Sequence, residues 1–204
     1  MTPEVLRETG WHVLLVAVSV GIATAIGVPL GVVLTRRPAW SRPVLGAVSV
    51  VQTIPSLALF GFLLPLPLIG GIGARTAIVA LLVYAMLPLL RNTYAGILSV
   101  DPAIVEAATG LGMTPRQRLF WVELPLALPV VLAGVRIATV VSIGLATIAA
   151  AIGAGGLGVL IYRGIAIVDN RQILAGAVPA ALLALAADGL LGALERRQSK
   201  WREA

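Results

Sequence analysis

Two long runs without a formal charge constrain this chain more than any other feature. Between Glu8 and Arg36 lie 27 uncharged residues, and between Arg42 and Arg75 lie 32 more. A helix needs about 20 mainly apolar residues to cross the hydrocarbon core of a bilayer. Each run therefore predicts at least one membrane-spanning helix.

The composition supports this interpretation. Only 12% of the residues are charged and 59% are apolar, whereas soluble domains have roughly 25% charged and about 45–50% apolar residues. This excludes a free soluble enzyme and a disordered chain. The chain has no cysteine and one histidine, His12, so we expect no metal site. The net charge of +6 lies in small clusters between apolar stretches, which favours a membrane protein over a nucleic-acid-binding one.

We predict an all-α integral membrane protein that forms a single domain, residues 1–204, with about five transmembrane helices. The expected spans are residues 11–34, 44–64, 76–95, 126–152 and 173–194. The first is too long for a secretory signal peptide and lacks a cleavage site, so we expect it to be retained. Within it, Gly27 and Gly31 form a pair of small residues that predicts close helix packing.

Basic residues predict the orientation of the chain, because they are enriched on the cytoplasmic side of membrane proteins. One side of the expected spans carries nine of them: Arg36, Arg37, Arg42, Arg116, Arg118, Arg196, Arg197, Lys200 and Arg202. The other side carries four: Arg7, Arg75, Arg163 and Arg171. We therefore expect the N-terminus outside and the C-terminus in the cytoplasm.

The cytoplasmic loop of about residues 99–125 has strong local signals at its start. Asp101 followed by Pro102 predicts an N-cap with proline at the first helical position. Helix-favouring residues follow, until Gly110 and Gly112 predict a left-handed stop. A short helix is therefore expected on the arginine-rich side.

A second short helix is expected directly after it. Thr114 and Gln117 have the spacing of a capping box, with Pro115 in the first turn. We expect this helix to end before Pro125, since proline disrupts a helix interior. Two capped helices joined by a glycine turn are more than a flexible tether.

This loop resembles the E-A-A-x3-G-x9-I-x-L-P signature of permease subunits of binding-protein-dependent ABC importers. The matching residues are Glu106, Ala107, Ala108, Gly112, Leu124 and Pro125. Val122 stands where the signature usually has isoleucine. The resemblance implies a type I importer permease fold, in which the loop, including Gly110 and Thr114, couples to the ATPase and the helix with Glu106 docks in a groove of that partner.

Other parts of the chain resemble the osmoprotectant branch of this family. They are residues 52–58, 89–93, 134–136 and 152–158. The resemblance implies import of glycine betaine, carnitine or choline across a bacterial or archaeal cell membrane. It also implies two copies of a cytoplasmic ATPase, an external binding protein and a second permease copy, identical or paralogous.

The chain itself is not expected to be an enzyme. Its only lysine is Lys200, so the GxxxxGK[ST] phosphate-binding loop is absent. We expect no cofactor in this chain, and the resemblance places ATP and Mg²⁺ on the partner ATPase.

Two groups of residues are candidates for the translocation path or its gate. Gln52, Thr53 and Ser56 surround Pro55 in the second span; they either satisfy backbone groups freed by the proline or line the path. Asn92, in the third span, is a further candidate. At the outer end of the fourth span, close helix packing or a flexible gate is expected of three glycines: Gly153, Gly155 and Gly156.

Arg136 and Asp188 are the formal charges deepest in apolar sequence. Such charges are costly unless they are paired or reach the interface, so each is a candidate functional residue. Our first hypothesis is a structural salt bridge between them, followed by snorkelling and then substrate contact. Three functions remain open: an ABC importer permease for osmoprotectants or another small solute such as ergothioneine, an ion-coupled carrier using Asp188, and a non-transporting membrane scaffold.

Overall fold

The computed structural model describes residues 2–199, and the regular structure in that range is helical. Lys200, Trp201 and Arg202, part of the basic tail, lie outside the described residues. The α-helices are α1 (Thr2–Arg36), α2 (Pro38–Gln52), α3 (Ser56–Leu63), α4 (Ala74–Leu98), α5 (Pro102–Gly110), α6 (Pro115–Arg118), α7 (Leu124–Ile148), α8 (Gly158–Ala166) and α9 (Asn170–Ser199). A π-helical turn, η1 (Leu119–Glu123), precedes α7, and a 3₁₀ turn, η2 (Ala149–Ile152), follows it.

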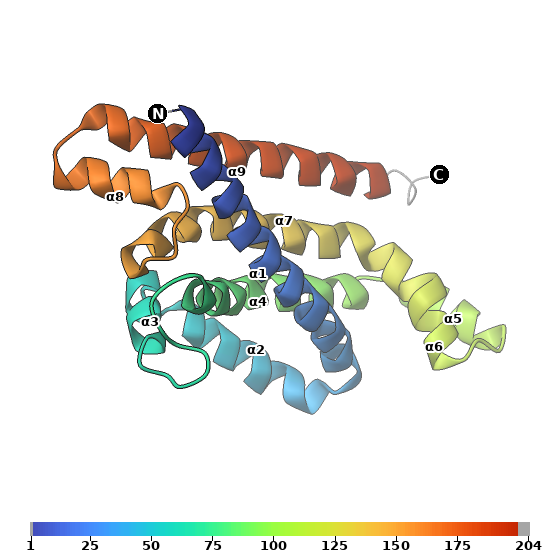
Figure 1. Cartoon of the computed structure of the whole chain (residues 1–204). Coiled ribbons are helices and arrows are strands. Elements are labelled where there is room, and N and C mark those ends of the chain that lie inside the picture. Colours follow the sequence, from blue (N-terminus) through green and yellow to red (C-terminus); the bar gives the residue numbers. More distant parts are fainter. Residues whose placement is uncertain (1, 200–204) are drawn as a thin grey trace.

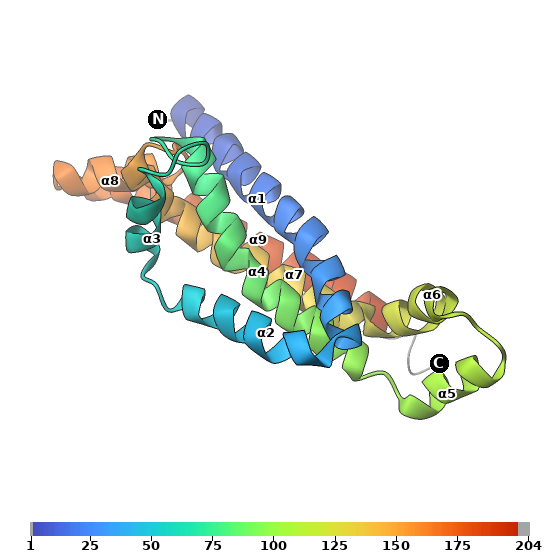
Figure 2. The same ribbon diagram turned by 90° about the horizontal axis from the view of Figure 1, so that it is seen from below.

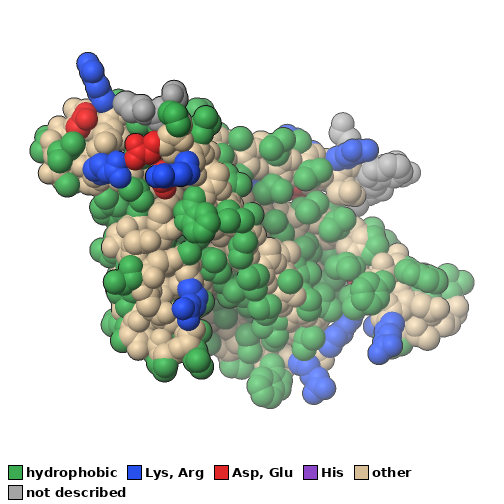
Figure 3. Space-filling view, in the orientation of Figure 1, with side chains coloured by type: hydrophobic (Ala, Val, Ile, Leu, Met, Phe, Trp, Pro, Cys, Tyr) green, Lys and Arg blue, Asp and Glu red, His purple; other side chains and the backbone are tan. Residues whose placement is uncertain are grey.

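The predicted fold class is confirmed. Four segments are long and apolar enough to cross a membrane: Pro3–Arg36, Ala74–Leu98, Pro115–Ile152 and Asn170–Gln198. The pair α2 and α3 makes a fifth if it counts as one broken span. In Figure 3, hydrophobic side chains cover the middle of the visible face, and charged side chains gather toward its two ends, as expected for a membrane-spanning bundle.

Close contacts at glycines hold α1 and α4 together. A Cβ atom added at Gly31 would lie 2.7 Å from the Cβ of Thr93, and one at Gly27 would lie 3.1 Å from that of Leu89. The close packing predicted for this glycine pair is therefore confirmed. Small residues let two helix backbones approach in this way. In a membrane the hydrophobic effect does not drive helices together, so the dispersion contacts of this close packing stabilise the pair.

The second expected span is not one helix. Helices α2 and α3 are bent by 98° at a break after Gln52. Pro55 has the extended ψ of 134° and precedes α3. Since proline lacks an N–H and restricts the residue before it, the chain turns here instead of continuing as a helix.

The fourth span, by contrast, is longer than expected, because the second loop helix does not end before Pro125. It continues from α6 through η1 into α7 as one apolar segment, Pro115–Ile152. The amide of Leu124 donates to the carbonyl of Leu119 across the π turn. This wide turn makes room for the proline ring, which an ordinary helix interior would exclude.

The elongated bundle has two distinct ends (Figures 1 and 2). One end, called the loop end, carries α5, α6 and the C-terminal end of α9. The other, called the N-terminal end, carries the start of α1, helix α3, the loop of residues 64–73 and helix α8. Helix α1 runs from one end to the other.

Candidate functional site

Helix α5 begins as the sequence predicts. The Asp101 side chain accepts a hydrogen bond from the amide of Ala103 at 2.8 Å, and Pro102 occupies the first helical position. The carboxylate therefore satisfies one of the backbone donors that a helix start leaves free.

The turn after α5 depends on one glycine instead of two. Gly112 has a φ of +78°, whereas Gly110 is the last residue of α5 and lacks a positive φ. The amide of Met113 donates to the carbonyl of Ala108 at 3.2 Å, and that of Gly112 to Thr109 at 3.0 Å. These two bonds close the helix end with the left-handed residue at Gly112, so the stop predicted at Gly110 is wrong.

The capping box at α6 is also present. The amide of Gln117 donates to the Thr114 hydroxyl at 3.3 Å, and the amide of Thr114 donates to the Gln117 side chain at 2.9 Å. The reciprocal pair fixes the restart of the chain at Pro115.

The signature residues on α5 have different environments. Glu106 and Ala107 are exposed, whereas Ala108 is buried. Glu106 also lines a cavity of about 290 Å³ between the end of α1 and the loop, together with Arg36 and Glu123. An exposed helix face with a carboxylate and a small neighbour is available to a partner protein.

Glu123 is the functional candidate that the sequence analysis missed. Its side chain is only 3% exposed and binds two arginines: Arg118 at 2.9 Å, and Arg36 at the end of α1. Arg118 also donates to the hydroxyl of Thr109 on α5 at 3.1 Å. The only sequence signal for Glu123 was its place between Val122 and Leu124, at a position where the signature allows any residue.

The polar residues near the bend have a structural explanation. The Gln52 amide donates at 2.6 Å to the carbonyl of Tyr84, the group that would accept from residue 88 if that residue were not Pro88. The Tyr84 hydroxyl donates to the carbonyl of Ile54 inside the break. Gln52 therefore does satisfy a backbone group freed by proline, but the proline is Pro88 and not Pro55.

The other path candidates lie nearby without forming one site. The exposed Thr53 donates to the Val50 carbonyl of its own helix, and Ser56 starts α3. Asn92 donates to the Pro88 carbonyl at 2.8 Å. Their roles in a translocation path remain predictions.

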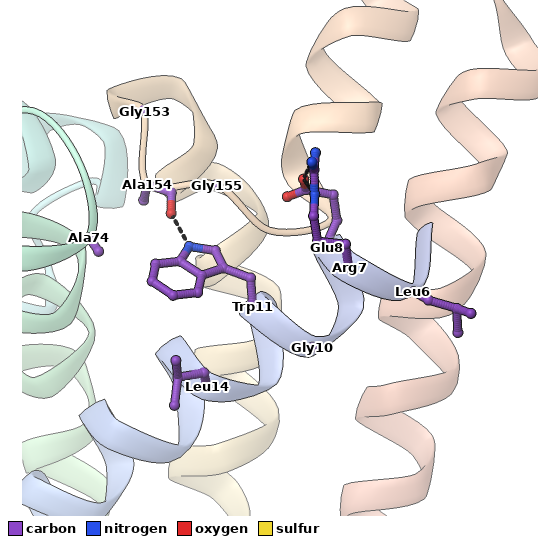
Figure 4. A pocket seen from close by; sticks show the side chains of 10 residues that line it. All are labelled: Leu6, Arg7, Glu8, Gly10, Trp11, Leu14, Ala74, Gly153, Ala154 and Gly155. Carbon is purple, nitrogen blue, oxygen red and sulfur yellow. Dashed lines mark hydrogen bonds and ion pairs between the residues drawn. The ribbon is translucent and has the colours of Figure 1, made fainter. Parts of the chain in front are cut away.

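The glycine segment lies at the N-terminal end of the bundle. Gly153, Gly155 and Gly156 all have positive φ, between +75° and +83°. The segment is bound to α1 at two points: the Trp11 indole donates to the Ala154 carbonyl at 2.7 Å (Figure 4), and the Gly156 amide donates to Glu8 at 3.0 Å. It is thus fastened to α1 by specific contacts, and its role as a gate remains a prediction.

An open cavity of about 570 Å³ lies beside this segment. Figure 4 shows the Trp11 ring directed toward Gly153–Gly155, with Leu14 below it and Ala74 across from it. His12, one residue on from Trp11, is buried, and its Nε2 lies 3.1 Å from the Ile143 carbonyl. His12 is therefore held inside the bundle by its packing and by this contact.

Arg136 and Asp188 are paired. Two guanidinium nitrogens of Arg136 contact the two carboxylate oxygens at 2.7 and 2.9 Å, and a third reaches Glu195 at 3.2 Å. The contact joins α7 to α9. The predicted salt bridge between Arg136 and Asp188 is therefore confirmed. Asp188 is 43% exposed in the isolated chain, so the pair lies at the bundle surface.

Together these features define a class of protein, a helical membrane permease. A loop of two capped helices lies at one end of the bundle, and a glycine segment hydrogen-bonded to α1 lies at the other. The described residues contain no cluster of three or more metal-ligating side chains. Residues 27–200 match the family described as binding-protein-dependent transport system inner membrane component, and the chain belongs to that family. It is therefore a multi-pass membrane protein and a permease subunit of an ABC importer.

Three comparisons give its relationships. The chain is 50% identical to the osmoprotectant import permease protein OsmW of Salmonella typhimurium, over 90% of this chain and 86% of that protein. It is 44% identical to the choline transport system permease protein OpuBB of Bacillus subtilis, over 95% and 88%. Its structure resembles the inward-facing MetNI methionine ABC transporter with a TM-score of 0.84 and 28% identity, covering 95% of this chain and 96% of that one.

Proposed function

We propose that this permease imports small quaternary-ammonium osmoprotectants such as glycine betaine, carnitine or choline. Relatives that align with almost the whole chain are named for osmoprotectant, choline and carnitine transport. The chain would work with a cytoplasmic ATPase dimer, an external binding protein and a second permease copy, identical or paralogous.

The loop that contains α5 and α6, at one end of the bundle, is the main structural support for this proposal. Both of its helices are capped by their own side chains, and Glu106 and Ala107 are exposed on the first. A rigid, exposed pair of helices suits docking to a protein that moves, because preorganisation lowers the entropic cost of binding. We infer that this end faces the cytoplasm, where the ATPase binds ATP and Mg²⁺.

The broken span is the element best placed to respond to loop movement. Beside the break, Gln52 at the end of α2 donates to the Tyr84 carbonyl of α4, and the Tyr84 hydroxyl donates to the Ile54 carbonyl. The break frees the halves to move about a defined point, as expected for alternating access. The path itself would form between two permease copies.

High-affinity recognition of the solute is assigned to the external binding protein. Quaternary ammonium groups are usually held in cages of aromatic side chains. This chain has ten aromatic residues of the Phe, Tyr and Trp types, and two of them, Trp11 and Tyr84, donate hydrogen bonds to backbone carbonyls. We infer that the permease passes the solute and does not select it.

Uptake by reconstituted vesicles tests the function. Vesicles with the chain, its ATPase and its binding protein should take up radiolabelled glycine betaine, carnitine or choline only when ATP is inside. Labelled ergothioneine is tested in the same way. Uptake of ergothioneine but of none of the other three solutes would identify the alternative substrate.

The same vesicles separate the two rival functions. An ion-coupled carrier would show uptake by the chain alone, driven by a proton or sodium gradient. A non-transporting scaffold would show no uptake with the partners present. Either result would overturn the proposal.

A further inference from the structure

We propose that Glu123 is a positioning residue that fastens the α5–α6 loop to the end of α1, so that displacement of the loop moves α1. This inference deepens the proposed function and rests on it. The loop signature leaves the position of Glu123 unspecified, so its role has to come from the contacts of its side chain.

Each carboxylate oxygen of Glu123 serves a different part of the fold. Oε1 accepts from Arg118 of α6 at 2.9 Å, and Oε2 accepts from Arg36, the last residue of α1. The Glu123 side chain is only 3% exposed, so water has little access to its carboxylate. A buried carboxylate that loses one partner is left with uncompensated interactions, so the arrangement resists separation of the two arginines.

The contacts continue from α6 to α5. A second nitrogen of Arg118 donates to the Thr109 hydroxyl at 3.1 Å. Thr109 lies three residues after Glu106, on the helix that we propose docks to the ATPase. A chain of polar contacts thus runs from α5 through Arg118 and Glu123 to Arg36.

Helix α5 has little else to hold it. Ala108 is the only residue of α5 that is buried, so apolar packing cannot fix its position. At the other end of the polar chain, α1 is packed tightly on α4 through Gly27 and Gly31. A movement of α5 would therefore be passed through Glu123 to a helix that is firmly part of the bundle.

The π turn places Glu123 in this position. Glu123 is the last residue of η1, and the extra residue of a π turn rotates the side chains that follow it. Phe120 and Trp121 of the same turn are 60% and 68% exposed, while Glu123 faces inward. The π turn thus directs its one charged side chain, that of Glu123, into the protein interior.

The test measures ATP hydrolysed per solute imported, with the complete importer in vesicles. Glu123→Gln keeps the shape but removes the charge, and it should raise the ratio roughly fivefold or more, the range of a typical coupling between sites. Glu123→Asp retains the carboxylate and should recover part of the coupling. Glu4→Gln is the matched control, because Glu4 pairs with Arg163 at 2.7 Å at the opposite end of the bundle; its ratio should stay normal.

A second readout does not depend on transport. The chain has no cysteine, so a single cysteine at the 80% exposed Leu111 can carry a nitroxide label. Glu123→Gln should increase the mobility of the label, and Glu4→Gln should not. Thr109→Val removes the Arg118 contact and the bond from the Thr109 hydroxyl to the Val105 carbonyl of the same helix, both at an exposed site. It should therefore fold normally and give a smaller change in the same direction.

The outcomes separate this inference from the function on which it rests. If the unmodified importer shows no ATP-driven uptake, the proposed function fails, while the label still reports whether Glu123 holds the loop. If uptake is normal but Glu123→Gln and Thr109→Val leave the ratio and the label unchanged, the inference is wrong. A parallel fall in hydrolysis and uptake at a constant ratio would equally overturn it; if Glu123→Gln does not assemble, Thr109→Val decides.

Discussion

The side-chain amide of Gln52 donates a hydrogen bond to the main-chain carbonyl of Tyr84 at 2.6 Å. In an uninterrupted helix that carbonyl would accept from residue 88, but Pro88 has no N–H to give. One helix thus supplies the donor that another helix lacks. The bond also lies beside the break between α2 and α3, where the Tyr84 hydroxyl holds the Ile54 carbonyl.

Replacing Gln52 with methionine should destabilise the protein by about 1–3 kcal/mol, because it leaves the buried carbonyl of Tyr84 unpaired. The thermal unfolding midpoint in a fixed detergent measures the effect. Pro88→Ala restores the missing N–H, so Gln52→Met should cost much less in that background. Thr53→Val is the control, since Thr53 is exposed and bonds only to its own helix; equal losses from Gln52→Met in both backgrounds would contradict the explanation.

Gly31→Ala should destabilise the contact between α1 and α4. The added Cβ would lie 2.7 Å from the Cβ of Thr93 and 3.3 Å from the carbonyl oxygen of Leu90. Overpacking of this kind costs about 1–3 kcal/mol. Gly21→Ala on the same helix meets nothing within 4 Å and should leave the unfolding midpoint unchanged or raise it. Indistinguishable midpoints for the two variants would rule out the tight contact.

Glu8→Ala should loosen the glycine segment at the N-terminal end. Its carboxylate accepts the hydrogen bond of the Gly156 amide at 3.0 Å, and loss of such a bond is worth about 1 kcal/mol. Amide hydrogen exchange in residues 153–158 should therefore quicken by roughly five- to tenfold. Arg7→Ala is the matched control, because Arg7 is 74% exposed and contacts Glu8 but not the segment. Unchanged exchange in Glu8→Ala would show that the Glu8 contact does not hold the segment.

Local signals predicted the parts of the fold that depend on nearby residues. The caps at Asp101 and Thr114 are visible in sequence because an N-cap involves residues two or three positions apart. The apolar runs likewise predicted the spans, since hydrophobic length is a property of a single segment. The end predicted before Pro125 failed because the π turn that accommodates this proline leaves no comparable signal.

Long-range contacts could not be predicted in the same way. Glu123 and Arg36 are 87 positions apart, and nothing in either neighbourhood identifies the other. Tyr84 was missed because both of its hydrogen bonds reach a different segment of the chain. Its carbonyl, freed by Pro88, accepts from Gln52, and its hydroxyl donates to the Ile54 carbonyl. Arg136 and Asp188 were the exception: charges within apolar sequence are so costly that the few present are expected to pair.

The contact of Arg136 with Asp188 gives a prediction that also tests the ion-coupled alternative. Asp188→Asn removes the two-point contact with the Arg136 guanidinium and leaves its 3.2 Å contact with Glu195, so thermal stability and uptake should both fall. The exchange of the two charges, Arg136→Asp with Asp188→Arg, should recover a large part of both, because a salt bridge between α7 and α9 needs opposite charges in either order. Uptake by the exchanged variant should still require ATP and respond to neither a proton nor a sodium gradient. Failure of the exchange together with gradient-dependent uptake in the unmodified protein would instead identify Asp188 as an ion-binding residue.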